Sequence, residues 1–258
     1  MSPKNTSNYT TVRSGQNQKA KEKAHFSLSV FPVNMKPVVF FDIDNTLVKG
    51  NTQRIMMIDL FKRKGISFCI LFWHALWFFG YKLGFNNKFE DVTKHTRKAY
   101  RIIKGWKVDE FANILDKIFQ SDIKPRIFKE ALQIIEKHKQ DGYEIVLLSA
   151  TIDPLAEAIG KGLGIKTCLA NRLYEENGIY TGELENRFVY GQGKADLITK
   201  IAREYDWDLN DSYAYTDHYT DSPLLSLVSN PRAVNPDKKL AMEAKHRNWP
   251  ILIWKTTK

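Results

Sequence analysis

Cysteine is scarce in this sequence: only Cys69 and Cys168 occur, without a CxxC motif and without a cluster of cysteine and histidine. A disulfide framework and a structural zinc site both require such patterns, so neither organises the fold. A reducing interior is the natural setting for a chain of this kind, and we expect a cytoplasmic protein. The first 24 residues also lack the apolar stretch of a secretory signal.

The sequence also lacks a continuous cluster of charges of one sign, although its formal net charge is +10. Residues 1–35 carry five Lys and Arg against one Glu, which places +4 of this charge in a polar segment that we expect to be a disordered basic tail. The remaining excess is scattered. Nucleic acid is therefore not an expected partner.

One apolar stretch, residues 66–85 (ISFCILFWHALWFFGYKLGF), complicates this picture. A transmembrane helix needs about 20 apolar residues, and Gly80, Lys82 and Gly84 interrupt this one. One or two buried or partner-facing helices are the first interpretation. A peripheral element that touches a membrane surface is the second, and a true span is the third.

Apolar runs of strand length alternate with helical patterns on either side of a helical block. This order predicts an α/β fold with a Rossmann-like parallel sheet covered by helices on both faces. The block at residues 50–122 reads as an inserted all-helical cap, which leaves residues 36–49 and 123–258 for the core. Asn177-Gly178, between two β-rich runs, predicts a hairpin.

The stretch VVFFDIDNTLV, residues 38–48, ends an apolar strand on two carboxylates, Asp42 and Asp44. An ionised carboxylate at the edge of a core is costly unless a metal, a hydrogen-bond network or a ligand compensates it. These two aspartates therefore predict partners elsewhere in the chain.

Polar side chains follow the other apolar strands too. In open parallel sheets the ligand lies beyond the carboxyl ends of the strands, so we expect these side chains to converge there. An all-oxygen set of this kind suits Mg²⁺, and a lysine with hydroxyls beside it suits a phosphoryl group. The residues concerned are Thr46, Ser149, Thr151, Lys194, Asp217 and Asp221.

In this arrangement the sequence resembles the haloacid dehalogenase (HAD) superfamily, specifically its phosphoserine-phosphatase-like subfamily IB. The resemblance covers about residues 37–254, and the cap block lies where this family carries its cap. Four motifs in the family's order carry it: DIDNT at 42–46, LLSAT at 147–151, GKADL at 193–197 and YTDHYTD at 215–221.

The resemblance implies a role for each matching residue. Asp42 is the nucleophile that forms an aspartyl-phosphate, and Asp44 is the general acid and base. Thr46 steadies this pair. Ser149, with Ala150 and Thr151, binds the phosphate.

Lys194 neutralises charge on the nucleophile and the phosphoryl group. The implied Mg²⁺ ligands are Asp42, Asp44 through its backbone carbonyl, and Asp217, with Asp221 supporting the ion. His218 is a candidate for substrate contact.

The sequence departs from the family at three places. Asn45 stands where many relatives have glycine, which its tolerance of left-handed backbone makes acceptable. The Asp217 ligand is flanked by Thr216 and His218. The stretch Val48 to Gln53 contains no carboxylate to grip a substrate amine.

Together these features predict a Mg²⁺-dependent phosphomonoesterase for a small phosphorylated metabolite, resembling phosphoserine or histidinol phosphate. The aromatic segment 66–85 keeps open a second substrate class, a lipid-derived phosphate at a membrane surface. Phosphoryl transfer to an acceptor other than water and a non-catalytic binding protein are the remaining alternatives. The sequence specifies no oligomeric state.

Overall fold

The computed structural model describes residues 35–63, 72–73, 76, 80, 97–185 and 188–255, all within a compact unit of residues 34–258. The expected tail, and most of the aromatic segment 66–85, lie outside these ranges. Within that segment Phe72, Trp73 and Leu76 are helical, with exposed fractions of 53%, 67% and 49%.

The core is a six-stranded parallel sheet, as expected, with the strand order β3-β2-β1-β6-β7-β8. Its strands are β1 (Lys36–Phe41), β2 (Glu144–Ile152), β3 (Thr167–Asn171), β6 (Trp207–Thr216), β7 (Asn230–Val234) and β8 (Ile251–Leu252). The order of the strands in the sheet reverses at β1, which pairs with β2 on one side and with β6 on the other.

Helices cover both faces of this sheet, which explains why the central strand β1 is apolar and buried from Val38 to Phe41. Val39 and Phe41 of β1 point into one core cluster, and Val38 and Phe40 point into the other. The first cluster includes α5 (Lys129–Gln140) and α6 (Asp153–Leu163). The second includes α7 (Gln192–Ile201), α8 (Ser222–Leu225) and α9 (Lys238–His246).

The cap block contributes α1 (Thr52–Lys62), the 3₁₀ turn η1 (Arg101–Ile103) and α4 (Val108–Ile118). A π-helical turn, η2 (Phe119–Ile123), and a second 3₁₀ turn, η3 (Lys124–Arg126), lead from α4 towards α5. Helix α4 therefore ends at Ile118, where the backbone widens into the π turn. The domain bounds 50 and 122 stay a prediction.

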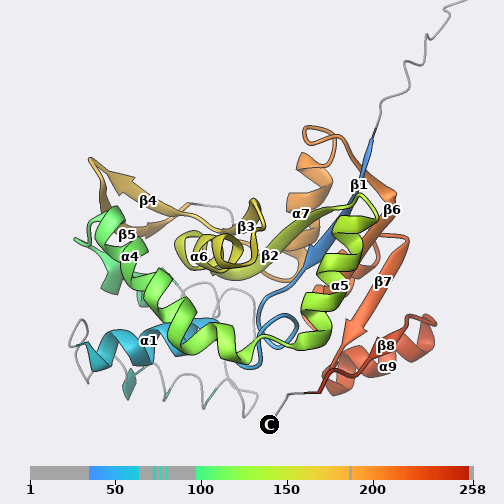
Figure 1. Cartoon of the computed structure of the whole chain (residues 1–258), viewed down its shortest axis with the longest axis horizontal. Helices are drawn as coiled ribbons and strands as arrows, with labels where there is room; N and C mark the ends of the chain where they lie inside the picture. Colours follow the sequence, from blue (N-terminus) through green and yellow to red (C-terminus); the bar gives the residue numbers. More distant parts are fainter. Residues whose placement is uncertain are drawn as a thin grey trace, which may run out of the picture. The chain divides into compact units, whose positions relative to one another are not determined.

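The hairpin expected at Asn177-Gly178 is confirmed as β4 (Leu173–Glu176) paired with β5 (Ile179–Leu184). Both turn residues have positive φ, 51° and 75°, as a tight two-residue turn between twisted strands requires. Backbone hydrogen bonds tie this hairpin to residues 105–108 of the cap block. Figure 1 accordingly shows α1, α4 and the hairpin grouped together, away from β7, β8 and α9.

Candidate active site

Four of the predicted polar stretches lie at one edge of the sheet. Asp42 directly follows β1, and Asp217 directly follows β6. Ser149 and Thr151 lie near the carboxyl end of β2. Because these three strands are parallel neighbours, their carboxyl ends meet at this edge. Lys194 reaches the same place from the first turn of α7.

Lys194 links two of the carboxylates. Its ammonium group donates to Asp42 Oδ1 at 2.6 Å and to Asp221 Oδ2 at 2.7 Å, and its side chain is 3% exposed. Thr216 Oγ1 donates to the same Asp221 oxygen at 2.8 Å. Although burial lowers it, the charges of Asp221 and Asp42 raise the pKa of Lys194 above its ordinary value. The lysine therefore stays charged in this site.

Acidic side chains outnumber basic ones at this edge of the sheet. Burial raises the pKa of Asp42 to about 7, against the lowering effect of Lys194. Burial and the charges of Asp42 and Asp221 raise the pKa of Asp217 to about 8. One lysine is thus not enough to keep all these carboxylates ionised near neutral pH, and a further cation would favour their charged forms.

The donor set fits a hard divalent cation such as Mg²⁺, because every candidate ligand is an oxygen and the uncompensated charge is negative. In the described part of the chain, however, no three Asp, Glu, His or Cys side chains converge closely enough to hold a metal ion. The Lys194 ammonium lies between Asp42 and Asp221 and pairs with both.

The cap's first helix fixes the side chain of Asp44. Asn51 Nδ2 donates to Asp44 Oδ2 at 2.8 Å, and Thr52 donates to Oδ1 through its backbone N–H at 2.8 Å and its hydroxyl at 2.7 Å. Asn51 also caps α1 by accepting from the Arg54 N–H. Burial raises the pKa of Asp44, and the hydrogen bonds from Thr52 oppose this shift.

Asn45, in the turn after Asp44, has the left-handed backbone conformation that we expected this residue to tolerate. Its φ is 55°, and its side chain accepts from the Gly50 N–H at 3.1 Å. The polar side chain therefore closes the loop that carries Asp44, which the glycine of many relatives cannot do.

Several predicted hydroxyls are buried near the carboxyl edge of the sheet. Ser149 Oγ accepts from the Thr151 N–H at 3.3 Å, which leaves the serine hydroxyl proton available for donation. Within the described ranges, the buried hydroxyls of Thr151 and Thr46 have no hydrogen-bond partner. Unmet buried hydroxyls are uncommon and are typical of a site that awaits a ligand.

The imidazole of His218 contacts Thr220 and Asp237. Its Nδ1 lies 2.9 Å from Thr220 Oγ1, and its Nε2 lies 3.4 Å from Asp237 Oδ2. With 42% of its side chain exposed, the histidine lies at the rim of this edge. Substrate contact by His218 stays a prediction.

Asn171 was not singled out from the sequence, yet it joins two parts of the site. It is fully buried at the end of β3; its Nδ2 donates to Ala150 O at 2.6 Å, and its Oδ1 accepts from the Val189 N–H at 2.7 Å. It thereby connects residues 149–151 of β2 to the segment that leads into α7 and Lys194. The motif ANRL around it, which includes the charged Arg172, shows no pattern that marks such a role.

We expect Asn171→Ala to lower the free energy of unfolding by about 1 to 3 kcal/mol, since the buried Val189 N–H loses its partner and Ala150 O keeps only its hydrogen bond from Gln53 Nε2. Phosphate release should fall at the same time, because residues 149–151 and the segment before α7 are no longer linked by the Asn171 side chain. Urea unfolding and steady-state kinetics measure the two effects. Asn210→Ala, at an exposed position of β6, is the matched control; an equal loss in both variants would contradict this role for Asn171.

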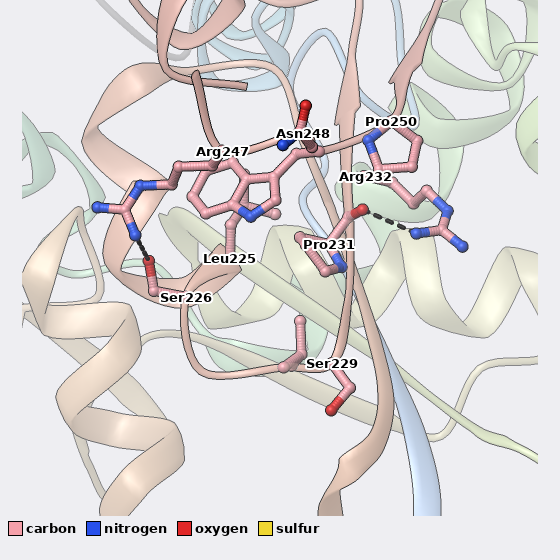
Figure 2. A pocket seen from close by; sticks show the side chains of 10 residues that line it. Leu225, Ser226, Ser229, Pro231, Arg232, Arg247, Asn248 and Pro250 are labelled. Carbon is pink, nitrogen blue, oxygen red and sulfur yellow. Dashed lines mark hydrogen bonds between the residues drawn. The ribbon is translucent and has the colours of Figure 1, made fainter. Parts of the chain in front are cut away.

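A separate pocket lies at the opposite edge of the sheet (Figure 2). It is lined around the amino ends of β7 and β8, where Arg247 stacks on Trp249 at 5.1 Å and donates to Ser226 Oγ at 3.5 Å. None of the predicted catalytic residues lines it. This pocket is therefore separate from the predicted site at the carboxyl edge.

Comparison with known proteins agrees with this geometry. Residues 39–226 match the family model of haloacid dehalogenase-like hydrolases. The chain belongs to this family. The HAD core and the parallel sheet expected from the sequence are thus confirmed.

Among curated relatives, phosphoserine phosphatase SerB1 of Mycobacterium tuberculosis is 32% identical over 222 residues, which cover 85% of this chain and 71% of that protein. Histidinol-phosphatase of Neisseria meningitidis is 26% identical over 225 residues, which cover 86% of this chain and 100% of that protein. Other relatives, from Streptomyces azureus and M. tuberculosis, are matched over only about half of their own length.

Among solved structures, a protein of unknown function from Bordetella pertussis Tohama I superposes with a TM-score of 0.75 at 21% identity, covering 84% of this chain and 98% of that one. This likeness concerns the fold. None of the described helices combines the length and the apolar composition needed to cross a bilayer.

Proposed function

We propose that this HAD-family protein is a Mg²⁺-dependent phosphomonoesterase that acts on a small phosphorylated metabolite through an aspartyl-phosphate intermediate. The observation that carries the proposal is the buried Asp42–Lys194–Asp221 chain at the carboxyl edge of the sheet, with Asp44 two residues from Asp42. The names of the relatives, a phosphoserine phosphatase and a histidinol-phosphatase, favour an amino-alcohol phosphate.

In the proposed mechanism a carboxylate oxygen of Asp42 attacks phosphorus, and the bond from phosphorus to the alcohol oxygen breaks. Asp44 gives its proton to the departing alcohol. Its raised pKa suits this role, because burial favours the protonated form. The same carboxylate then takes a proton from the water that attacks the aspartyl-phosphate, which releases inorganic phosphate and restores both aspartates.

Ser149 and Lys194 would hold the phosphoryl oxygens while these bonds change. Mg²⁺ would be held by Asp42, the Asp44 backbone carbonyl and Asp217, with support from Asp221, and it would neutralise the charge of the phosphate. The hydrogen bonds from Asn51 and Thr52 orient Asp44 and so link the cap's first helix to proton transfer.

A lipid-derived phosphate is the second candidate substrate class, and one observation favours it. Phe72, Trp73 and Leu76 are helical and exposed, although all three are large and apolar. Scattered apolar residues on a surface are ordinary, but three within five residues form a patch that suits a hydrocarbon chain or membrane surface.

The test is phosphate release from phosphoserine, histidinol phosphate, a nucleoside monophosphate and lysophosphatidate, each with Mg²⁺ and with EDTA. We expect release that EDTA abolishes, with the amino-alcohol phosphates as the best substrates. Lysophosphatidate as the best substrate would favour the lipid candidate, and transfer product with little free phosphate would favour a phosphotransferase. No release or transfer from any of them by the folded protein would contradict the proposal.

A further inference from the structure

The carboxylate of Asp217, the implied Mg²⁺ ligand after β6, accepts no hydrogen bond from any of the described residues. Asp221, four residues later, differs from it, because its Oδ2 accepts from both Lys194 and Thr216. A side chain that no hydrogen bond orients takes its position from the backbone that carries it. The contacts that hold the backbone of residues 217–221 therefore determine where the Asp217 carboxylate can lie.

One residue from another loop contacts this segment at three points. Asp237, which lies between β7 and α9, donates from its backbone N–H to the Asp217 carbonyl oxygen at 2.9 Å. Its Oδ2 accepts from the Tyr219 N–H at 3.2 Å and lies 3.4 Å from His218 Nε2. Asp237 therefore contacts three consecutive residues, the first of which is the expected ligand.

The imidazole of His218 extends these contacts along the loop. The Thr220 N–H donates to Nδ1 at 3.3 Å, so in the neutral ring Nδ1 is the acceptor and Nε2 carries the proton. The ring thereby presents an N–H to Asp237 Oδ2. The His218 carbonyl oxygen accepts from the Asp221 N–H at 3.0 Å. The contacts of Asp237 thus extend from Asp217 to Asp221, at the two ends of the loop.

Asp237 itself lies in a firmly anchored turn. Its Oδ1 caps α9 by accepting from the Leu240 N–H at 2.7 Å. Two residues earlier, the Asn235 N–H donates to Leu252 O at 2.8 Å, and Asn235 Oδ1 accepts from the Trp254 N–H at 2.9 Å. The turn is therefore tied to the β8 segment on one side and to the loop after β6 on the other. This anchoring makes Asp237 a fixed support for that loop.

We propose that Asp237 is a positioning residue that holds residues 217–221 in the conformation needed to bind a divalent cation. Its two carboxylate oxygens have separate roles, since Oδ1 caps α9 and Oδ2 supports the loop. Asp237 acts through the loop and does not ligate the ion. This inference rests on the proposed Mg²⁺ site and adds to it a residue outside the four sequence motifs.

Asp237→Ser separates the roles of the two oxygens. Serine caps helices about as well as aspartate, so the contact with the Leu240 N–H should remain and the melting temperature should fall by less than about 2 °C. The Tyr219 N–H loses its acceptor. Hydrogen exchange of the peptide that covers residues 217–221 in the metal-free protein should therefore become about three- to tenfold faster, the value of one hydrogen bond. The α9 peptide should keep its rate, and Lys239→Ser, at an exposed position of α9, is the control for both peptides.

The cation is tested with Mn²⁺ as the probe and without substrate, by measuring free Mn²⁺ with electron paramagnetic resonance. About 0.5 M KCl screens the charge that the substitution removes. The Kd for Mn²⁺ should rise by about three- to tenfold in Asp237→Ser, because the ion then has to order the loop. Asp237→Ala should show the same rise and also lower the melting temperature by about 2 to 4 °C, because it loses the cap as well. Lys239→Ser should change the Kd by less than about twofold.

The outcomes separate this role from the alternatives. Weaker Mn²⁺ binding in Asp237→Ala but not in Asp237→Ser would assign Asp237 to helix capping alone and overturn the positioning role. A loss beyond about a hundredfold in Asp237→Ser would make Asp237 a ligand of the ion, which also overturns it. The expected rise in Kd would support the role even if no phosphomonoester were hydrolysed. A wild type that binds no Mn²⁺ would overturn both this role and the proposed metal site.

Discussion

Replacing Lys194 with methionine should cost the protein both its stability and its activity. The ammonium is the shared partner of Asp42 and Asp221, at 2.6 and 2.7 Å, and all three side chains are buried. Methionine fills a similar volume but leaves two carboxylates without a countercharge. Removing one member of a buried ionic group typically costs about 3 to 5 kcal/mol, and we expect a loss of this size in urea unfolding.

Phosphate release by Lys194→Met should fall by about a thousandfold, because the phosphoryl oxygens lose a positioned cation. The control is Lys200→Met, which changes the other lysine of α7 at an exposed position and should shift stability by less than about 0.5 kcal/mol. Adding Asp221→Asn to Lys194→Met removes one unpaired charge and should restore part of the stability but not the activity. Similar losses in the two lysine variants would show that Lys194 is not a special member of the site.

The parts of the site that could be predicted from sequence share a simple physical signal. Asp42, Ser149 and Asp217 each stand at the end of an apolar run, where a polar residue interrupts a buried strand. Parallel topology then brings such ends together without any knowledge of side-chain contacts. The hairpin at Asn177-Gly178 was predictable for a comparable reason, because its two residues are those that accept positive φ.

Other parts left no such signal. Asn171 acts through one buried polar side chain, and asparagine occurs elsewhere in the chain without that burial. Its partners, Ala150 and Val189, come from segments distant in sequence. Helix α9 was also not anticipated, although its cap, Asp237 accepting from the Leu240 N–H at 2.7 Å, is a local feature.

The second large effect is expected at Asp42. Asp42→Asn keeps the shape of the side chain but removes the nucleophilic carboxylate, so phosphate release should fall by at least about 10⁴-fold, as for other covalent nucleophiles. Stability should change little. The variant loses its ion pair with Lys194, but it also removes a buried charge that burial and the neighbouring carboxylates disfavour. Asp109→Asn, at an exposed position in the first turn of α4, is the control.

Loss of activity alone would not distinguish a nucleophile from a metal ligand, so the intermediate itself has to be measured. Acid quenching during turnover of a ³²P-labelled substrate should trap label on the wild-type protein and none on Asp42→Asn. Asp44→Asn should still form the intermediate from p-nitrophenyl phosphate, whose leaving group needs little protonation, and should then hydrolyse it slowly. A burst of p-nitrophenol from Asp44→Asn, absent in Asp42→Asn, would divide the chemistry between the two aspartates. Equal labelling of wild type and Asp42→Asn would instead place the covalent step on another residue.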